Sequence, residues 1–181
     1  MKPRKLILFL LWLVLVLMSV FNSQQLYAQS NSNDDSFRRV VTGINEEGKS
    51  VIISDGVVPQ NAQYSGDFGF GSDIWLEQCI PVDLTNKNDP LGDYIVTTEP
   101  PSGGVVARVV QWNPGRKYPM HVTNTIDIFI VISGQIKLIL DESDTILNSG
   151  DSVIQCGTNH GWEVVGDTPC MFAAILLSAD K

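Results

Sequence analysis

The sequence predicts an all-β fold, an antiparallel sandwich or barrel, on three observations. No window after residue 28 shows a persuasive helical period. Short runs rich in β-branched and apolar residues recur at close spacing instead. The segments between these runs are dominated by Gly, Pro, Asn and Asp, which favour turns. The expected strands, in order, cover residues 38–42, 49–54, 74–79, 105–112, 126–132, 135–140, 152–155, 161–165 and 170–177.

The first 28 residues have the pattern of a secretory signal peptide. Basic residues precede an unbroken apolar run over 6–18, and Ala28 ends a Leu-Tyr-Ala sequence suited to cleavage. We therefore expect an exported protein, secreted or periplasmic, unless the segment stays uncleaved as a membrane anchor. The polar stretch 29–36 is expected to be a disordered leader before a single domain over 37–181. Within that domain, residues 61–71 are expected to form a flexible loop over the barrel mouth.

Composition limits the classes of partner. The chain carries 20 acidic and 12 basic residues, a net charge of −8, and loss of the signal peptide would remove only basic residues. An acidic protein of this kind is unsuited to nucleic acid or anionic lipid, because both are polyanions. The three cysteines allow one disulfide at most, and three small buried thiols are the alternative.

The two histidines lie in similar glycine-bounded segments. In "GRKYPMHVTNTIDIFIVISG", His121, Thr123 and Asp127 are separated by even numbers of residues, so a regular strand would place their side chains on one face. Three such donors inside a barrel could hold a metal. In "GDSVIQCGTNHGW", a Gly-Asp turn and a short apolar run precede His160.

This pair of segments resembles the two motifs of the cupin family. The first cupin motif reads G-x5-H-x-H-x3-or-4-E-x6-G, and its glycines, first histidine and spacing match Gly115 to Gly134. Thr123 replaces the second histidine of that motif, and Asp127 replaces its glutamate. In the second motif Gly150 and the Gly157-x2-His160 ending match, whereas the segment is one residue shorter. The residue pattern of the two segments is similar to that of a subgroup of small single-domain cupins with Thr at the position of Thr123.

The resemblance implies a single-domain, jelly-roll type β-barrel in which His121 and His160 approach each other across the interior. It also implies that these histidines and Asp127 bind one divalent transition metal, Fe, Mn or Zn. Thr123 would then hydrogen-bond a metal-bound water or line the pocket. The alternative is a barrel without metal, in which both imidazoles are simply hydrogen-bonded.

Four further residues are candidates for the pocket, and a fifth borders the second motif. Arg108 interrupts an apolar strand face, so it either binds a substrate carboxylate or forms a salt bridge at the rim. Gln155 is a possible pocket donor, and Phe129 and Trp162 are possible pocket walls, although such residues are often ordinary packing. Cys156 is a possible soft ligand or, more simply, a buried structural thiol.

Two functions compete at this point. The first is an exported metal-dependent enzyme acting on a small organic molecule, with dioxygenase, isomerase, decarboxylase or lyase chemistry all compatible with the resemblance. The second is a module that binds a small molecule or sugar without turnover. The resemblance to the family also implies a homodimer.

Overall fold

The computed structural model describes residues 36–86 and 88–180. The expected signal peptide and nearly all of the expected leader therefore lie outside the described residues. Within the described ranges, no helix combines the length and the hydrophobicity that a membrane crossing requires. The elements are β1 (Arg38–Ile44), β2 (Ser50–Val57), a 3-10 turn (Gln60–Ala62), β3 (Gln63–Gly66), β4 (Gly69–Glu77), β5 (Val105–Trp112), β6 (Lys117–His121), β7 (Thr125–Ser133), β8 (Gln135–Leu140), β9 (Asp144–Asn148), β10 (Ser152–Cys156), β11 (His160–Val164) and β12 (Cys170–Ser178).

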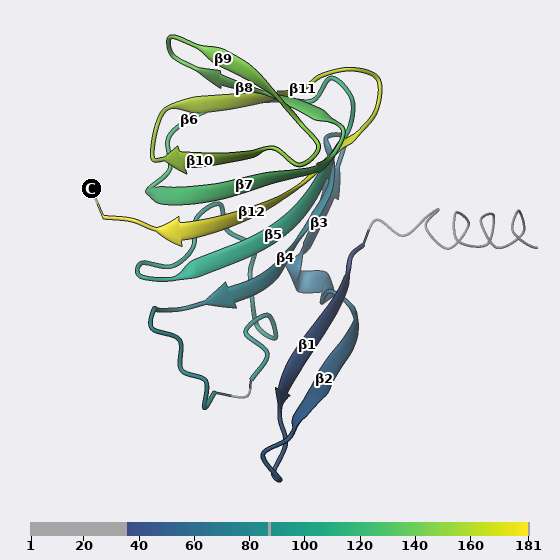
Figure 1. Ribbon diagram of the computed structural model, residues 1–181, viewed down its shortest axis with the longest axis vertical. Helices are drawn as coiled ribbons and strands as arrows, with labels where there is room; N and C mark the ends of the chain where they lie inside the picture. Colours follow the sequence, from purple (N-terminus) through teal and green to yellow (C-terminus); the bar gives the residue numbers. More distant parts are fainter. Residues whose placement is uncertain (1–35, 87, 181) are drawn as a thin grey trace, which may run out of the picture. The chain divides into compact units, whose positions relative to one another are not determined.

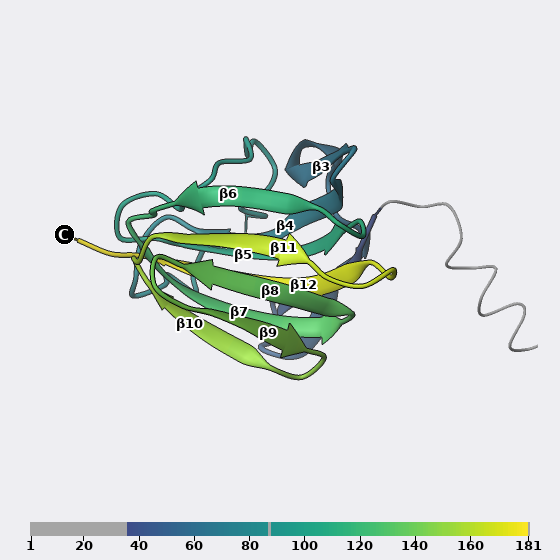
Figure 2. The ribbon, with the colours of Figure 1, turned by 90° about the horizontal axis from the view of Figure 1, so that it is seen from above.

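The strands form two main antiparallel sheets and a separate hairpin (Figures 1 and 2). The larger sheet has the order β10-β7-β12-β5-β4-β3, and the smaller has the order β6-β11-β8-β9. Strands far apart in the sequence are therefore neighbours, as β12 is with both β5 and β7. The all-β prediction is confirmed, and each of the nine expected strands forms.

The core lies between the two sheets. Along β12, buried side chains alternate with partly exposed ones, so Cys170, Phe172, Ala174 and Leu176 share the inner face. Phe129 of the larger sheet stacks on Trp162 of the smaller sheet, with ring centroids 4.4 Å apart. Aromatic side chains from both sheets thus fill the interior and set the shape of the space that remains.

The segment 61–71 is not the flexible loop that its composition suggests. It contains β3 and the start of β4, which continues into the larger sheet. A Cβ on Gly69 would lie 2.0 Å from the carbonyl oxygen of Gln111, and a Cβ on Gly71 would lie 2.3 Å from the ring of Tyr64. These glycines permit close packing between strands, so their role is steric rather than flexible.

Three strands were not predicted from the sequence, namely β3, described above, and β6 and β9. β6 and β9 are the outer strands of the smaller sheet, and β6 contains Pro119. Proline interrupts the usual strand signal but is tolerated at a sheet edge, where an N–H is not needed. β6 matters for function because it carries one of the two histidines.

The first two strands form a hairpin outside the two main sheets, visible at the bottom of Figure 1. Phe37 stacks on Phe70 with ring centroids 5.2 Å apart, and the buried Arg39 pairs with Asp89 through both carboxylate oxygens. Beyond these anchors, most of the hairpin side chains are exposed.

Candidate functional site

His121 and His160 lie side by side at one end of the interior. His121 ends β6 and His160 begins β11, and the two residues are direct partners in the antiparallel pair of these strands. Their ring centroids are 4.2 Å apart. His160 is 2% exposed, whereas His121 is only partly buried. The glycine-bounded segments thus bring the two histidines together, but as neighbours on adjacent strands of one sheet and not across the interior as expected.

Backbone carbonyls fix the orientation of both imidazoles. Nδ1 of His121 lies 3.0 Å from the carbonyl oxygen of Pro119, and Nδ1 of His160 lies 2.9 Å from that of Thr158. A carbonyl can only accept, so Nδ1 carries the hydrogen and Nε2 keeps the lone pair in each neutral ring. Burial lowers the pKa of His160 from its ordinary value, and the neighbouring His121 lowers it further. His160 is therefore held in the neutral form that a ligand or a base requires.

Asp127 and Thr123 border the same space. They do not share one regular strand with His121, because β6 ends at His121 and β7 begins at Thr125. Thr123 is buried and accepts a 2.8 Å hydrogen bond from the hydroxyl of Thr125. Oδ1 of Asp127 is buried without a hydrogen-bond partner, and burial raises the pKa of this carboxyl against the opposing effects of its surroundings. A buried oxygen without a partner is available to a ligand.

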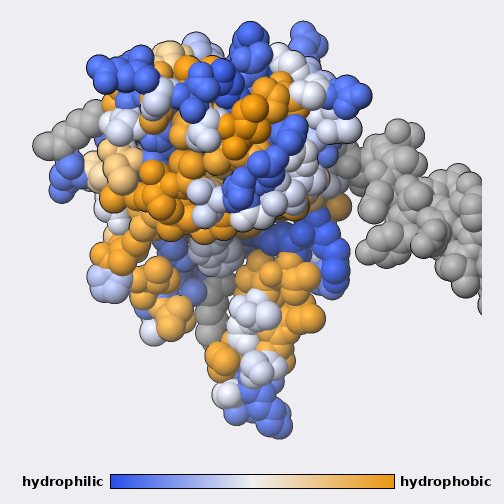
Figure 3. All heavy atoms as spheres, turned by 45° about the horizontal axis from the view of Figure 1, so that its top comes forward, coloured by the Kyte–Doolittle hydropathy of each residue, from blue (hydrophilic) through white to orange (hydrophobic). Residues whose placement is uncertain are grey.

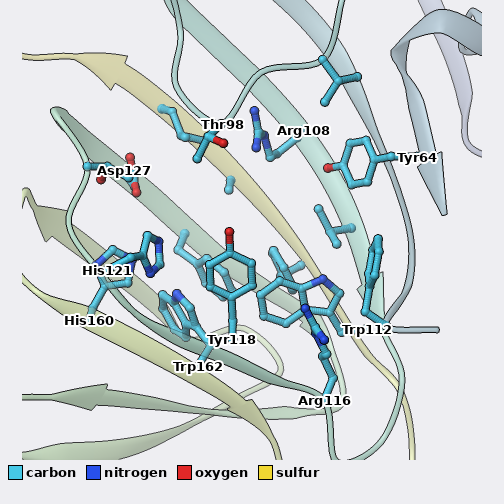
Figure 4. A pocket seen from close by; sticks show the side chains of 18 of the residues that line it. Tyr64, Thr98, Arg108, Trp112, Arg116, Tyr118, His121, Asp127, His160 and Trp162 are labelled. Atoms are coloured by element: carbon cyan, nitrogen blue, oxygen red, sulfur yellow. The ribbon is translucent and has the colours of Figure 1, made fainter. Parts of the chain in front are cut away.

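The expected three-ligand metal centre is not assembled as such. Among the residues that the structure describes, no three His, Cys, Asp or Glu side chains are grouped closely enough to hold a metal ion. Two imidazoles with available Nε2 atoms are present, and Asp127 lies on the same side of the cavity in Figure 4. The two imidazole nitrogens are donors that suit a divalent transition metal, and the carboxylate of Asp127 lines the same cavity.

A cavity of about 330 Å³ opens beside the imidazoles. This volume is sufficient for a small organic molecule. Phe129 stacks on both Trp162 and Phe172, with centroids 4.4 and 4.3 Å apart, and these rings form a continuous apolar wall. The polar side chains that share the cavity lining are Tyr64, Thr97, Thr98, Arg108, Arg116, Tyr118, His121, Thr123, Asp127 and His160.

Arg108 is part of a buried ion pair and not of a rim salt bridge. Its Nε lies 3.1 Å from Oδ1 of Asp73, whose side chain is fully buried, and its own side chain is 15% exposed. One Nη atom donates a 3.0 Å hydrogen bond to the carbonyl of Thr97. The other oxygen of Asp73 accepts a 2.7 Å hydrogen bond from Tyr94. Arg108 lines the cavity, but its charge is already largely matched by Asp73.

Gln155 and Cys156 lie outside the cavity lining. Gln155 is buried on β10, where its side-chain oxygen accepts a hydrogen bond from Thr158 and its Nε2 has no partner. It is the cross-strand neighbour of Asp127. Cys156 is exposed and is therefore not a buried thiol, and all three cysteines are free, with only Cys170 buried. Burial raises the pKa of Cys170 to about 11, so it is an unreactive thiol.

Arg116 and Tyr118 were not predicted as site residues from the sequence. Both line the cavity, and the ring of Tyr118 contacts that of His121. Their i, i+2 spacing places them on one face of the chain leading into β6. That spacing was a usable signal, but Pro119 had removed β6 from the expected strands.

Comparison with known proteins is consistent with this architecture. The family model described as a Cupin domain matches residues 108–176. The chain is 42% identical over 87 residues to phomopsin biosynthesis cluster protein C' of Diaporthe leptostromiformis, covering 45% of this chain and 46% of that protein. The chain thus spans less than half the length of that relative.

Two further relatives align over more of the chain. The cupin-domain-containing oxidoreductase srdD of Neurospora crassa is 30% identical over 128 residues, which cover 68% of this chain and 64% of that protein. Oryzines biosynthesis cluster protein J of Aspergillus oryzae is 36% identical over 133 residues, which cover 68% and 72%. Among solved structures, a cupin 2 conserved barrel domain protein from Salinispora arenicola CNS-205 superposes with a TM-score of 0.39 at 21% identity, covering 41% of this chain and 64% of that one.

The domain match includes both histidine segments, and relatives named for the same domain align over two thirds of the sequence. The chain therefore belongs to the cupin family.

Proposed function

We propose that this cupin is an enzyme that transforms a small organic molecule in its cavity, using one divalent transition metal, Fe, Mn or Zn, bound by His121, His160 and Asp127. The observation that carries the proposal is the pair of imidazoles, 4.2 Å apart, at one end of an aromatic-lined cavity. Relatives named as cupin-domain-containing oxidoreductases support redox chemistry among the possible reactions.

Different parts of the cavity have different roles in the proposed reaction. The carbonyls of Pro119 and Thr158 hold the imidazoles with Nε2 free, and the aromatic wall would orient the molecule. Asp127 supplies negative charge beside the imidazoles. A bound metal would act there as a Lewis acid toward an oxygen of the substrate.

A binding module without turnover is the second candidate. It is favoured by one observation, that no three metal-ligating side chains are grouped within the described residues. Such a module would hold a small molecule or sugar against the same aromatic wall. Its binding would be indifferent to chelators, because the metal would have no part in it.

Metal analysis separates the two candidates. The full chain is purified without a polyhistidine tag and without added metal, beside His121→Ala, His160→Ala, Asp127→Ala and the exposed control Asp151→Ala. We expect one equivalent of metal in the wild type and the control, and loss in both histidine variants. Equal metal in all five proteins would contradict the site. Loss in the histidine variants alone would remove Asp127 from the ligand set.

We also propose that the protein is exported, on the support of its N-terminal sequence pattern. The intact mass of the protein recovered from its producing cells is the test. We expect a mature N-terminus at Gln29, and retention of residues 1–28 would indicate an anchored form.

We also propose that the protein forms a homodimer. Large apolar side chains are exposed on the hairpin and on the outer face of β7 and β10, and apolar surface is visible on the hairpin and over the front of the barrel in Figure 3. Apolar patches of this kind are typical of interaction sites. The exposed residues are Val40, Ile44, Ile52, Ile53 and Val57 on the hairpin and Ile126, Ile130, Ile132 and Ile154 on the sheet.

A further inference from the structure

Arg116 is a cavity-lining arginine held on a rigid backbone. It follows Gly115, whose positive φ of 72° turns the chain into β6. Its N–H donates to the carbonyl of Asn113 at 3.1 Å, and its carbonyl accepts from the N–H of Val164 at 2.8 Å. The backbone of Arg116 is therefore held beside the cavity by hydrogen bonds at both of its peptide groups.

Arg116 differs from the other described arginines in its partners. Arg38, Arg39 and Arg108 each pair with an aspartate. Within residues 36–86 and 88–180, the guanidinium of Arg116 makes no ion pair or hydrogen bond, and its Nε is buried without a partner. A buried donor without a partner costs free energy, so an anion in the cavity would be favoured at this point.

Aromatic rings hold the guanidinium in place. Its Cζ lies 5.4 Å from the ring centroid of Phe68 and 5.9 Å from that of Tyr118. Contacts of this kind offset part of the lost solvation of a cation without neutralising its charge. The forked N–H donors remain able to bind a carboxylate with two parallel hydrogen bonds.

The position of Arg116 sets the length of a ligand. The ring of Tyr118 lies between Arg116 and His121, because it contacts both, with a centroid distance of 4.8 Å to His121. Figure 4 shows Arg116 and the histidines on opposite sides of Tyr118. A molecule that reaches from one to the other has a polar head, a body about one aromatic ring long and a second end at the imidazoles.

We propose that Arg116 binds the carboxylate of a flat, apolar monoacid whose far end lies against His121 and His160. Arg108 is committed to Asp73, so Arg116 is the arginine of the cavity with an unmatched charge. Asp127 would repel a second anionic group near the imidazoles. The inference names the substrate class of the proposed enzyme, but the binding step needs no metal.

The test uses trans-cinnamate and its uncharged analogue cinnamamide as probes. Trp112 and Trp162 line the cavity, so their fluorescence reports binding to the full chain kept in chelator. We expect cinnamate to bind the wild type more tightly than cinnamamide. Arg116→Met keeps the apolar stem of the side chain and should weaken cinnamate binding by roughly 10- to 100-fold, while cinnamamide binding stays unchanged.

Arg38→Met is the matched control, because Arg38 is an exposed arginine of the hairpin whose partner is Asp55. It should bind both probes as the wild type does, and thermal melts of both variants verify folding. Equal binding of the two probes by the wild type, binding of neither, or unchanged cinnamate binding in Arg116→Met would overturn the proposal. Because chelator is present throughout, a negative metal analysis leaves this result unaffected.

Discussion

The carboxylate of Asp73 and the guanidinium of Arg108 form an ion pair in the interior, with Oδ1 and Nε 3.1 Å apart. They lie opposite each other on β4 and β5, and Tyr94 donates a hydrogen bond to the second oxygen of Asp73. Burial raises the pKa of Asp73, against the opposing effects of Arg108 and Tyr94. The carboxylate therefore depends on these two partners for its charged form.

Asp73→Ala should destabilise the fold strongly. It leaves Arg108 buried without its anion and Tyr94 without its acceptor, and loss of one partner of a buried pair typically costs about 3–5 kcal/mol. Urea denaturation measures the change. Asp55→Ala removes the partner of Arg38 in an exposed pair and should leave the midpoint almost unchanged, because solvent screens such pairs. A similar midpoint for both variants would contradict this account of Asp73.

Gly69→Ala should be far more damaging than Gly48→Ala. Both glycines have positive φ, 126° and 75°, so alanine is strained at either position. The added Cβ at Gly69 would also lie 2.0 Å from the carbonyl oxygen of Gln111, whereas Gly48 has open space around it. We expect a loss of roughly 1 kcal/mol for Gly48→Ala and about 3 kcal/mol or more for Gly69→Ala. Equal losses, measured by denaturant titration, would show that β4 and β5 can separate without cost.

The strands that the sequence predicts are those with an uninterrupted local pattern. β12 is recognisable because Cys170–Leu177 is an unbroken run of apolar residues, and β6 is not, because Pro119 interrupts a short edge strand. The glycines of β4 looked like loop residues, since composition does not show that Gln111 would approach Gly69 so closely. Steric contacts between distant segments are therefore the part of this fold that composition leaves open.

The same limit applies to the candidate site. The two histidines were identified because each lies in a recognisable motif, and the cupin assignment is confirmed. The ion-pair partner of Arg108 was not identified from the sequence. Asp73 lies in a glycine-rich segment 35 residues earlier, and only the pairing of β4 with β5 brings it near Arg108. Arg116 was not predicted for a different reason. Its distinguishing feature is that its guanidinium makes no ion pair or hydrogen bond within the described residues. A sequence motif does not reveal such a feature.

Disrupting the exposed apolar surface should change the oligomeric state. Ile52 on the hairpin is 62% exposed, so Ile52→Lys adds charge without disturbing the core. We expect light scattering coupled to gel filtration to give a dimer mass for the wild type and a monomer mass for this variant. Thr145→Lys, on the exposed β9 at the opposite end of the domain in Figure 1, should remain dimeric. A monomeric wild type would contradict the homodimer directly.

His160 should titrate below its ordinary pKa of 6.5 in metal-free protein, because burial disfavours its charged form. The chain has two histidines, so NMR of the imidazole protons gives two titration curves, and His160→Gln assigns them. Since the unfolded state binds this proton more readily, the contribution of neutral His160 to stability is complete above about pH 6.5 and declines as the pH falls toward the folded pKa. The raised pKa of Asp127 acts in the opposite sense, because protonation of that carboxyl favours the native state at low pH.

Comparing wild type with His160→Gln separates the two effects, since Asp127 is present in both proteins. The unfolding free energy of the wild type, minus that of His160→Gln, should fall as the pH is lowered below about 6.5. A His160 curve at or above the ordinary value would mean that the imidazole gains a proton readily inside the barrel. Burial would then not control the protonation of His160, and a metal would compete with protons at this imidazole as it does at an exposed histidine.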